Sequence, residues 1–226
     1  MPEKIRPSIG KIEGMLGRRY GHPPWTASRP LMDVLVETIL SQNTSDSNSH
    51  RAFLALKKKY PGWEALAGAQ TGSIARTIRS GGLENIKSRR IKDLVSFILG
   101  KRGKAGLEFL KKMPREAAYR YLLAIKGVGP KTAACTLLFG AGIPVYPVDT
   151  HIYRVSSRLG WVKRKEDRES FQERFRKLVP DKMVYPLHLN LIEHGRRICH
   201  PRKPECLDCC LNKACNWKEK PHESVH

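Results

Sequence analysis

Two residues of different chemistry, Lys131 and Asp149, stand at the expected starts of two helices. Lys131 follows a Gly-Val-Gly turn, and Asp149 precedes Thr150, where its side chain can cap a helix. A lysine amine is a nucleophile only when neutral, and partial burial at a helix N-terminus lowers a lysine pKa from its usual value of about 10.4. The pair therefore suits covalent catalysis in which a carboxylate stabilises developing positive charge.

The turn before Lys131 has the composition of a phosphate-binding hairpin. Gly127 and Gly129, on either side of Val128, can adopt positive φ angles and leave room for a phosphate group. Backbone N–H groups at the start of the next helix, where Thr132 lies, can then bind phosphate oxygens. An ordinary turn between two helices is the alternative, but the lysine that follows favours phosphate binding.

Four cysteines near the C-terminus have the spacing C-x6-C-x2-C-x5-C; they are Cys199, Cys206, Cys209 and Cys215. Clustered thiolates are soft ligands that suit either zinc or a [4Fe–4S] cluster. Zinc sites more often contain two C-x2-C pairs, whereas only the middle pair has that spacing here. Cys210 lies outside the pattern and is expected to be a free thiol.

Helices are expected to position all of these groups. Apolar residues recur at helical spacing and no window alternates with period two, which predicts an all-α fold. After an N-terminal helix within residues 3–28 that includes Ile5, we expect helices at residues 30–42, 46–60, 63–68, 71–80, 86–101, 105–111, 115–125, 166–179 and 184–198. A chain of 226 residues can form one large or two modest domains.

The charge of the chain is one-sided, with 42 Lys and Arg against 21 Asp and Glu and a net charge of +21. Such an excess favours a polyanionic partner, and no basic amphipathic helix points to lipid instead of nucleic acid. No run of about 18 apolar residues offers a membrane span, and the N-terminus lacks the apolar segment of a signal peptide. We therefore expect a cytoplasmic, nucleoid-associated prokaryotic protein without a membrane partner.

The run IKGVGPKTA at 125–133, followed by VDTH at 148–151, resembles the helix-hairpin-helix and Gly-Pro-Asp loop of the endonuclease III family of DNA glycosylases. The cysteine spacing is also similar to the cluster loop of that family, which favours [4Fe–4S] over zinc. The resemblance covers roughly residues 30–220 and implies a two-lobed all-α fold with DNA across the groove between the lobes. A helical barrel lobe is expected at 29–140, with the helix-hairpin-helix at about 115–139, and a second lobe at 1–28 and 141–226, with the cluster loop at 199–215.

In family members that also cleave the strand, the lysine at the position of Lys131 attacks C1′ of the damaged nucleoside and the aspartate at the position of Asp149 assists departure of the base. The resemblance thus implies a monomeric base excision repair enzyme, a DNA glycosylase with AP lyase (β-elimination) activity. Its partner would be double-stranded DNA with damaged or mismatched bases or abasic sites, and oxidised pyrimidines are the expected targets. Two alternatives remain: a monofunctional glycosylase for mismatched U, T or A or for 5-methylcytosine, and a non-catalytic DNA-binding module.

Two turns resemble family loops that fill the gap left by a flipped nucleotide. The Leu83 loop (residues 82–88) resembles the wedge loop, which carries an apolar residue at the position of Leu83. The Gln42 turn (residues 40–46) resembles the loop that inserts a glutamine, although Asn43 stands where glutamine is usual. Either Gln42 or Asn43 can therefore face the unpaired base, and a core leucine and a polar helix cap are the plainer alternatives.

Three further residues are candidates. Glu37 lies in an apolar helix where adenine-removing relatives carry an acid that protonates the leaving base, or it is a surface or paired carboxylate. Arg202 and Lys203 lie between the first two cysteines and are expected to contact phosphates, with a solvated basic turn as the alternative.

Overall fold

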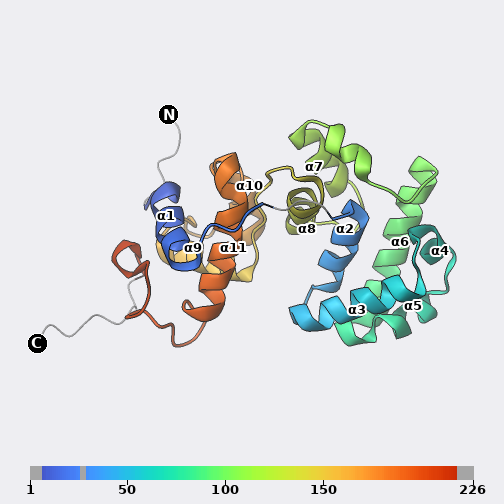
Figure 1. Cartoon of the computed structure of the whole chain (residues 1–226), viewed down its shortest axis with the longest axis horizontal. Coiled ribbons are helices and arrows are strands. Elements are labelled where there is room, and N and C mark those ends of the chain that lie inside the picture. The colour runs from blue at the N-terminus through green and yellow to red at the C-terminus, as the bar shows by residue number, and fades with distance from the viewer. Residues whose placement is uncertain (1–6, 26–28, 218–226) are drawn as a thin grey trace, which may run out of the picture. The chain divides into compact units, whose positions relative to one another are not determined.

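The computed structural model describes residues 7–25 and 29–217, and in these ranges every regular element is a helix (Figure 1). The predicted all-α class is therefore confirmed. The chain divides into two compact units, Thr26–Ile143 and Met1–Trp25 with Pro144–His226. The predicted lobe boundaries at 29 and 140 fall inside the first of these units.

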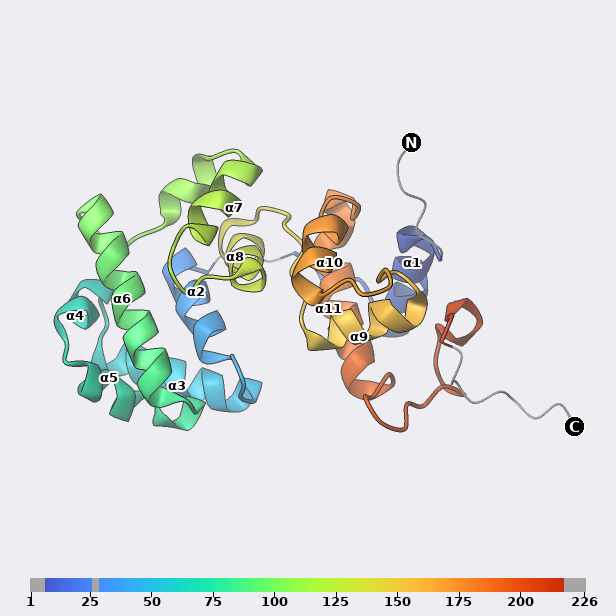
Figure 2. The same cartoon turned by 180° about the vertical axis from the view of Figure 1, so that it is seen from behind.

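The unit of Thr26–Ile143 is built around one apolar helix, α2. Its helices are α2 (Leu31–Leu40), α3 (Asp46–Lys59), α4 (Trp63–Gly68), α5 (Thr71–Thr77), α6 (Glu84–Arg102), α7 (Arg115–Leu123) and α8 (Pro130–Thr136), with a 3₁₀ turn, η1, at Arg79–Gly81. Because α2 is buried on most of its circumference, it packs against α3, α6 and α8 together. Figure 2 shows α6 beside α4 and α5, which cover its other side.

Two segments of this unit differ from the expected α-helices. The predicted helix at 105–111 is wrong: the chain forms a 3₁₀ turn, η2 (Glu108–Lys112). The Glu108 carboxylate accepts hydrogen bonds from the backbone N–H groups of Leu107 and Leu31, which holds this segment in a tight turn. At the other end, α8 continues into a π-helical turn, η3 (Leu137–Ala141).

The second unit contains α1 (Ile9–Tyr20), α9 (Thr150–Leu159), α10 (Arg168–Phe175), α11 (Asp181–Arg197) and a final 3₁₀ turn, η4 (Asn212–Ala214). Helix α11 packs against both α1 and α9. Aromatic rings of Trp161, Phe171 and Phe175 stack in the core beside α10. The predicted helices at 166–179 and 184–198 exist with shifted ends, and Ile5 lies outside the described residues.

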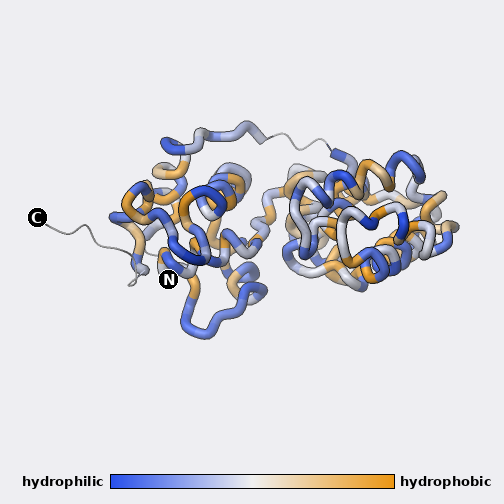
Figure 3. The backbone as a smooth tube through the Cα atoms, turned by 90° about the horizontal axis from the view of Figure 1, so that it is seen from below, coloured by the Kyte–Doolittle hydropathy of each residue, from blue (hydrophilic) through white to orange (hydrophobic). Residues whose placement is uncertain are grey.

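Figure 3 shows polar and apolar residues alternating along the helices, as expected for helices buried on one face. Throughout residues 7–25 and 29–217, no helix is both long and apolar enough to span a membrane.

Candidate active site and cysteine pocket

Lys131 is the second residue of α8 and is half-buried. Gly129 caps this helix with an extended backbone (φ −89°, ψ 175°), and Pro130 occupies the first helical position. Of the two hairpin glycines, Gly127 alone has a positive φ, of 87°. The expectation of positive φ at both glycines is therefore right for Gly127 and wrong for Gly129, because a helix N-cap requires extended backbone.

The side chains of Val128 and Thr132 are buried. Phosphate contact through these two side chains is therefore excluded, whereas the backbone N–H groups of the hairpin remain candidates. This agrees with the backbone-mediated binding expected from the sequence, although DNA contact by the hairpin remains a prediction.

Asp149 caps α9, since its Oδ1 accepts a hydrogen bond from the backbone N–H of Ile152 at 2.7 Å. The predicted cap is confirmed. Two buried polar residues hold the chain just before it: Gln172 Oε1 accepts from the N–H of Val148 at 2.9 Å, and His188 Nδ1 donates to the carbonyl of Pro147 at 3.1 Å. The sequence analysis identified neither residue. Gln172 could have been recognised as buried, because it lies between Phe171 and Phe175 on one helix.

The Gln42 turn and the Leu83 loop both contain residues with left-handed backbone. Asn43 has a φ of 53° and is exposed, and Leu83 has a φ of 50° and is 46% exposed. The Gln42 side chain is engaged, because its Oε1 accepts from Nη1 of Arg90 at 2.7 Å. The Gln42 side chain is therefore fixed by a hydrogen bond, whereas Asn43 is exposed. Contact of either residue with DNA stays a prediction.

Lys87, which sequence reasoning also missed, is buried in the same unit. Its Nζ donates to the carbonyls of Leu40 and Gly81 at 2.7 and 2.8 Å. Burial lowers the pKa of the Lys87 ammonium group, and the positive charge of the nearby Arg90 guanidinium lowers it further. Leu40 is the first residue of the Gln42 turn, and Gly81 directly precedes the Leu83 loop.

Glu37 is a paired carboxylate and not an orphaned one. Its Oε1 accepts from Nδ1 of His50 at 2.9 Å, and its Oε2 accepts from the guanidinium of Arg29. Both oxygens are thus engaged, and an acid role for Glu37 remains a prediction that requires one partner to move. Arg202 and Lys203 are exposed, Lys203 with a φ of 50°, and their phosphate contacts are likewise untested predictions.

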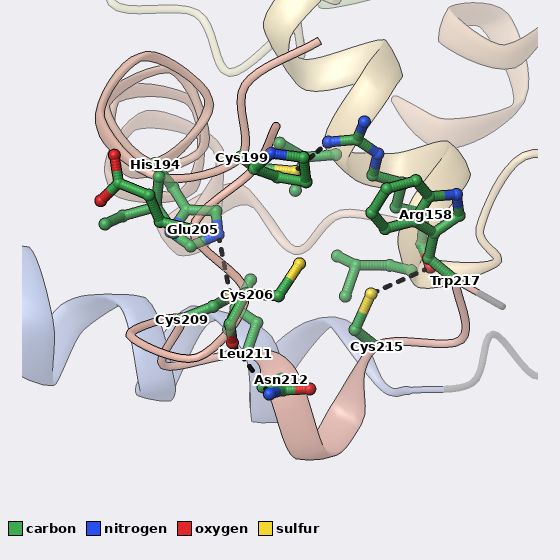
Figure 4. Close-up of a pocket in the computed structure, with 14 residues that line it drawn as sticks. Arg158, His194, Cys199, Glu205, Cys206, Cys209, Leu211, Asn212, Cys215 and Trp217 are labelled. Atoms are coloured by element: carbon green, nitrogen blue, oxygen red, sulfur yellow. Dashed lines mark hydrogen bonds between the residues drawn. The ribbon is translucent and has the colours of Figure 1, made fainter. Parts of the chain in front are cut away.

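The four patterned cysteines line one pocket of the second unit (Figure 4). The sulfur atoms of Cys206 and Cys215 face the same space, and Cys199 lies at its border, where its sulfur accepts from Nη1 of Arg158 at 3.1 Å. The remaining ligand candidate, Cys209, is near His194, with 3.5 Å between Sγ and Nε2. Apolar residues, among them Val155 and Leu211, line the pocket together with polar ones such as Glu205 and Asn212.

The four thiols share this pocket without meeting at one point. Among the described residues, no three or more His, Cys, Asp or Glu side chains converge closely enough to hold one metal ion. Zinc and a [4Fe–4S] cluster both take cysteine thiolates as ligands, so the expected cluster stays a prediction. Burial raises the pKa of Cys209 to about 12, so a thiolate at this position needs a compensating positive charge.

Helix α9 connects the candidate aspartate to the cysteine loop. Asp149 is the N-cap of α9. Arg154, in the second turn of the helix, donates to the carbonyls of Cys199 and Gly195 at 2.8 and 2.7 Å. Arg158 donates to the carbonyl of His200 at 2.7 Å. The fold of the cysteine loop is therefore tied directly to the helix that presents Asp149, whereas Lys131 belongs to the other unit.

Comparison with known proteins gives a consistent picture. Residues 36–181 match the model of the HhH-GPD superfamily base excision DNA repair protein. A protein of Arabidopsis thaliana named as a DNA glycosylase is 38% identical over 174 residues, which cover 77% of this chain and 59% of the plant protein. Endonuclease III of Thermotoga maritima is 35% identical over 184 residues, covering 81% of this chain and 82% of that protein.

Among solved structures, a trapped endonuclease III–DNA covalent intermediate has a TM-score of 0.78 and 25% identity, covering 92% of this chain and 93% of that chain. The expected resemblance to endonuclease III is thereby confirmed. Since similar relatives come from a plant as well as from Thermotoga maritima, the expected prokaryotic origin gains no support.

Proposed function

Because the chain belongs to the HhH-GPD superfamily of base excision DNA repair proteins, we propose that this DNA glycosylase also has AP lyase activity. Its proposed substrate is duplex DNA with a damaged base, an oxidised pyrimidine in the first instance, and it acts as a monomer. The placement of Lys131 carries this proposal: a half-buried lysine in the first turn of α8, directly after a hairpin able to bind phosphate. Similarity to an endonuclease III that forms a trapped covalent intermediate with DNA supports it.

The proposed reaction assigns one step to each residue. The neutral amine of Lys131 attacks C1′, the bond from C1′ to the base breaks, and the base leaves with a proton. The carboxylate of Asp149, fixed by its cap hydrogen bond, stabilises positive charge on the sugar during this step. The amine nitrogen then loses a proton, the C1′–O4′ bond breaks, O4′ takes up a proton, and the opened sugar is left as a protonated Schiff base between C1′ and Lys131. This group acidifies the C2′ protons, and loss of one of them with departure of the 3′ phosphate (β-elimination) opens the strand.

Cys199, Cys206, Cys209 and Cys215 would hold a [4Fe–4S] cluster in this proposal. When bound, the cluster would supply structural cross-linking of the C-terminal loop, which cannot bury an apolar core of its own. Arg154 and Arg158 would transmit that order to α9 and so to Asp149. Arg202 and Lys203, in the same loop, are proposed to bind DNA phosphates.

Borohydride trapping tests the proposal, because reduction of the Schiff base leaves a covalent protein–DNA adduct. A panel of duplexes with one altered base each is assayed separately for base release, strand cleavage and trapping. We expect all three with an oxidised pyrimidine, and we expect Lys131→Gln to lose trapping and cleavage. Base release without trapping would instead identify a monofunctional glycosylase, and binding without either reaction would identify a non-catalytic module.

A further inference from the structure

Lys87 lies where a buried cation can hold two backbone turns together. Only 2% of the residue is exposed, and its ammonium group donates to the carbonyls of Leu40 and Gly81. Leu40 ends α2, so its carbonyl lies at the negative end of a helix dipole, and Gly81 ends the 3₁₀ turn η1. The charge is thus compensated by groups that would otherwise lack helical hydrogen-bond partners.

Arg90 lies on the same face of α6, one turn after Lys87. Its Nη1 donates to Oε1 of Gln42, and because a guanidinium has no acceptor, this contact fixes the amide orientation on chemical grounds. The Gln42 NH₂ group is then the end left to donate to another partner. The aliphatic part of Arg90 lies against the hairpin, since a Cβ added at Gly127 would be 3.1 Å from its Cγ and Cδ.

We propose that Lys87 and Arg90 are positioning residues that hold the Gln42 turn and the Leu83 loop as one rigid pair. Lys87 sets the distance between the two backbones, and Arg90 sets the direction of the Gln42 amide. The pair can then fill both sides of a single nucleotide vacancy at once, with an apolar side chain and an oriented hydrogen-bond donor. This inference rests on the proposed function, because it assigns the two turns to the space left by an extruded nucleotide.

The backbone conformation of the two turns explains why they need such positioning contacts. Asn43 and Leu83 both have left-handed backbones, which cost free energy for residues other than glycine and persist only where neighbouring contacts enforce them. Without the ammonium group, each turn can relax independently. Two independently mobile side chains would have to be ordered when DNA binds, and the ordering entropy would oppose insertion.

The test compares variants on two substrates under single-turnover conditions, a lesion in duplex DNA and the same lesion in a single strand. Only the duplex creates a vacancy opposite an unpaired base. We expect Arg90→Ala to slow base release from the duplex about tenfold, the loss of one charge-assisted hydrogen bond, while the rate on the single strand changes less than twofold. Arg89→Ala, which removes a neighbouring exposed charge from α6, should change neither rate.

A double-mutant cycle separates positioning from direct DNA contact. If Arg90 acts through Gln42, Arg90→Ala adds no further loss in the Gln42→Ala background. Additive losses, or an equal loss on both substrates, would overturn the proposal for Arg90.

For Lys87, the matched control is Lys92. Its Nζ also donates to a backbone carbonyl, that of Ala69 at 2.7 Å, but Ala69 belongs to neither turn. Lys87→Met should abolish the fluorescence change of 2-aminopurine placed opposite an abasic site, whereas Lys92→Met should retain it. This readout needs no catalysis, so a protein without glycosylase activity still reports on insertion. A retained fluorescence change in a folded Lys87→Met variant would overturn the assignment, and circular dichroism verifies folding.

Discussion

The Nε2 atom of His194 lies 3.5 Å from the Sγ atom of Cys209, and the Tyr20 hydroxyl lies 3.0 Å from Nδ1 of the same ring. Burial lowers the pKa of His194 to about 4, so the ring is neutral and carries one N–H. A metal-bound thiolate only accepts hydrogen bonds, which would make Nε2 the donor to Cys209 and Tyr20 the donor to Nδ1. If Cys209 binds a cluster as proposed, the buried His194 ring would stand ready to donate a hydrogen bond to its thiolate.

Cys209→Ser should lose iron and sulfide and the broad visible absorbance of a cluster, and it should lower the melting temperature because the C-terminal loop loses its cross-link. Cys210→Ser is the matched control, since the adjacent cysteine lies outside the spacing pattern and outside the pocket lining. Iron analysis, absorbance and thermal unfolding measure the outcome. A colourless parent protein with one zinc ion per chain would reject the cluster.

Asp149 is predicted to have two roles that different substitutions separate. Asp149→Asn should keep the cap of α9, because asparagine caps helices as well as aspartate, and the melting temperature should stay unchanged. Base release should nevertheless fall by about a hundredfold or more, since the carboxylate charge is lost. Asp149→Ala should lose both activity and about 1 kcal/mol of stability. Equal activity of Asp149→Asn and the parent would exclude an electrostatic role.

The two glycines of the hairpin should respond differently to alanine. Gly127→Ala places a side chain at a φ of 87° and within 3.1 Å of Arg90, so we expect a loss of about 1–2 kcal/mol in stability. Weaker duplex binding should accompany it. Gly129→Ala is the control for stability alone, because Gly129 has a φ of −89° and no protein atom lies near its added Cβ. Thermal unfolding and fluorescence anisotropy give the two quantities, and an intact Gly127→Ala hairpin would contradict the assignment.

Glu37→Gln tests whether this carboxylate is an ion-pair partner or an acid. With both oxygens engaged by Arg29 and His50, we expect a modest loss of stability, about 1 kcal/mol, and base release within about twofold of the parent. The pH–rate profile for each substrate should keep its shape. A hundredfold loss confined to one substrate, together with a missing acid limb, would instead identify Glu37 as a proton donor.

Local patterns along the chain were sufficient for several features. Helical periodicity predicted an all-α protein, and the residue types around Gly127 and Asp149 predicted a tight turn and a helix cap that the structure contains. Each of these features depends on residues within about one helical turn of one another, which is the range over which sequence patterns act. The cysteine spacing was readable because all four residues fall within one short segment, residues 199–215.

Tertiary structure alone decided which polar groups hold those features in place. Arg90 meets Gln42 across 48 positions, Lys87 meets Leu40 across 47, and His188 meets Pro147 across 41. Such pairs leave no periodic or spacing signal, because they form only after apolar faces have packed and excluded water. The sequence by itself determined most of the helices, the Asp149 cap and the set of four cysteines. Packing determined that Lys87 and Arg90 contact the Gln42 turn and the backbone just before the Leu83 loop.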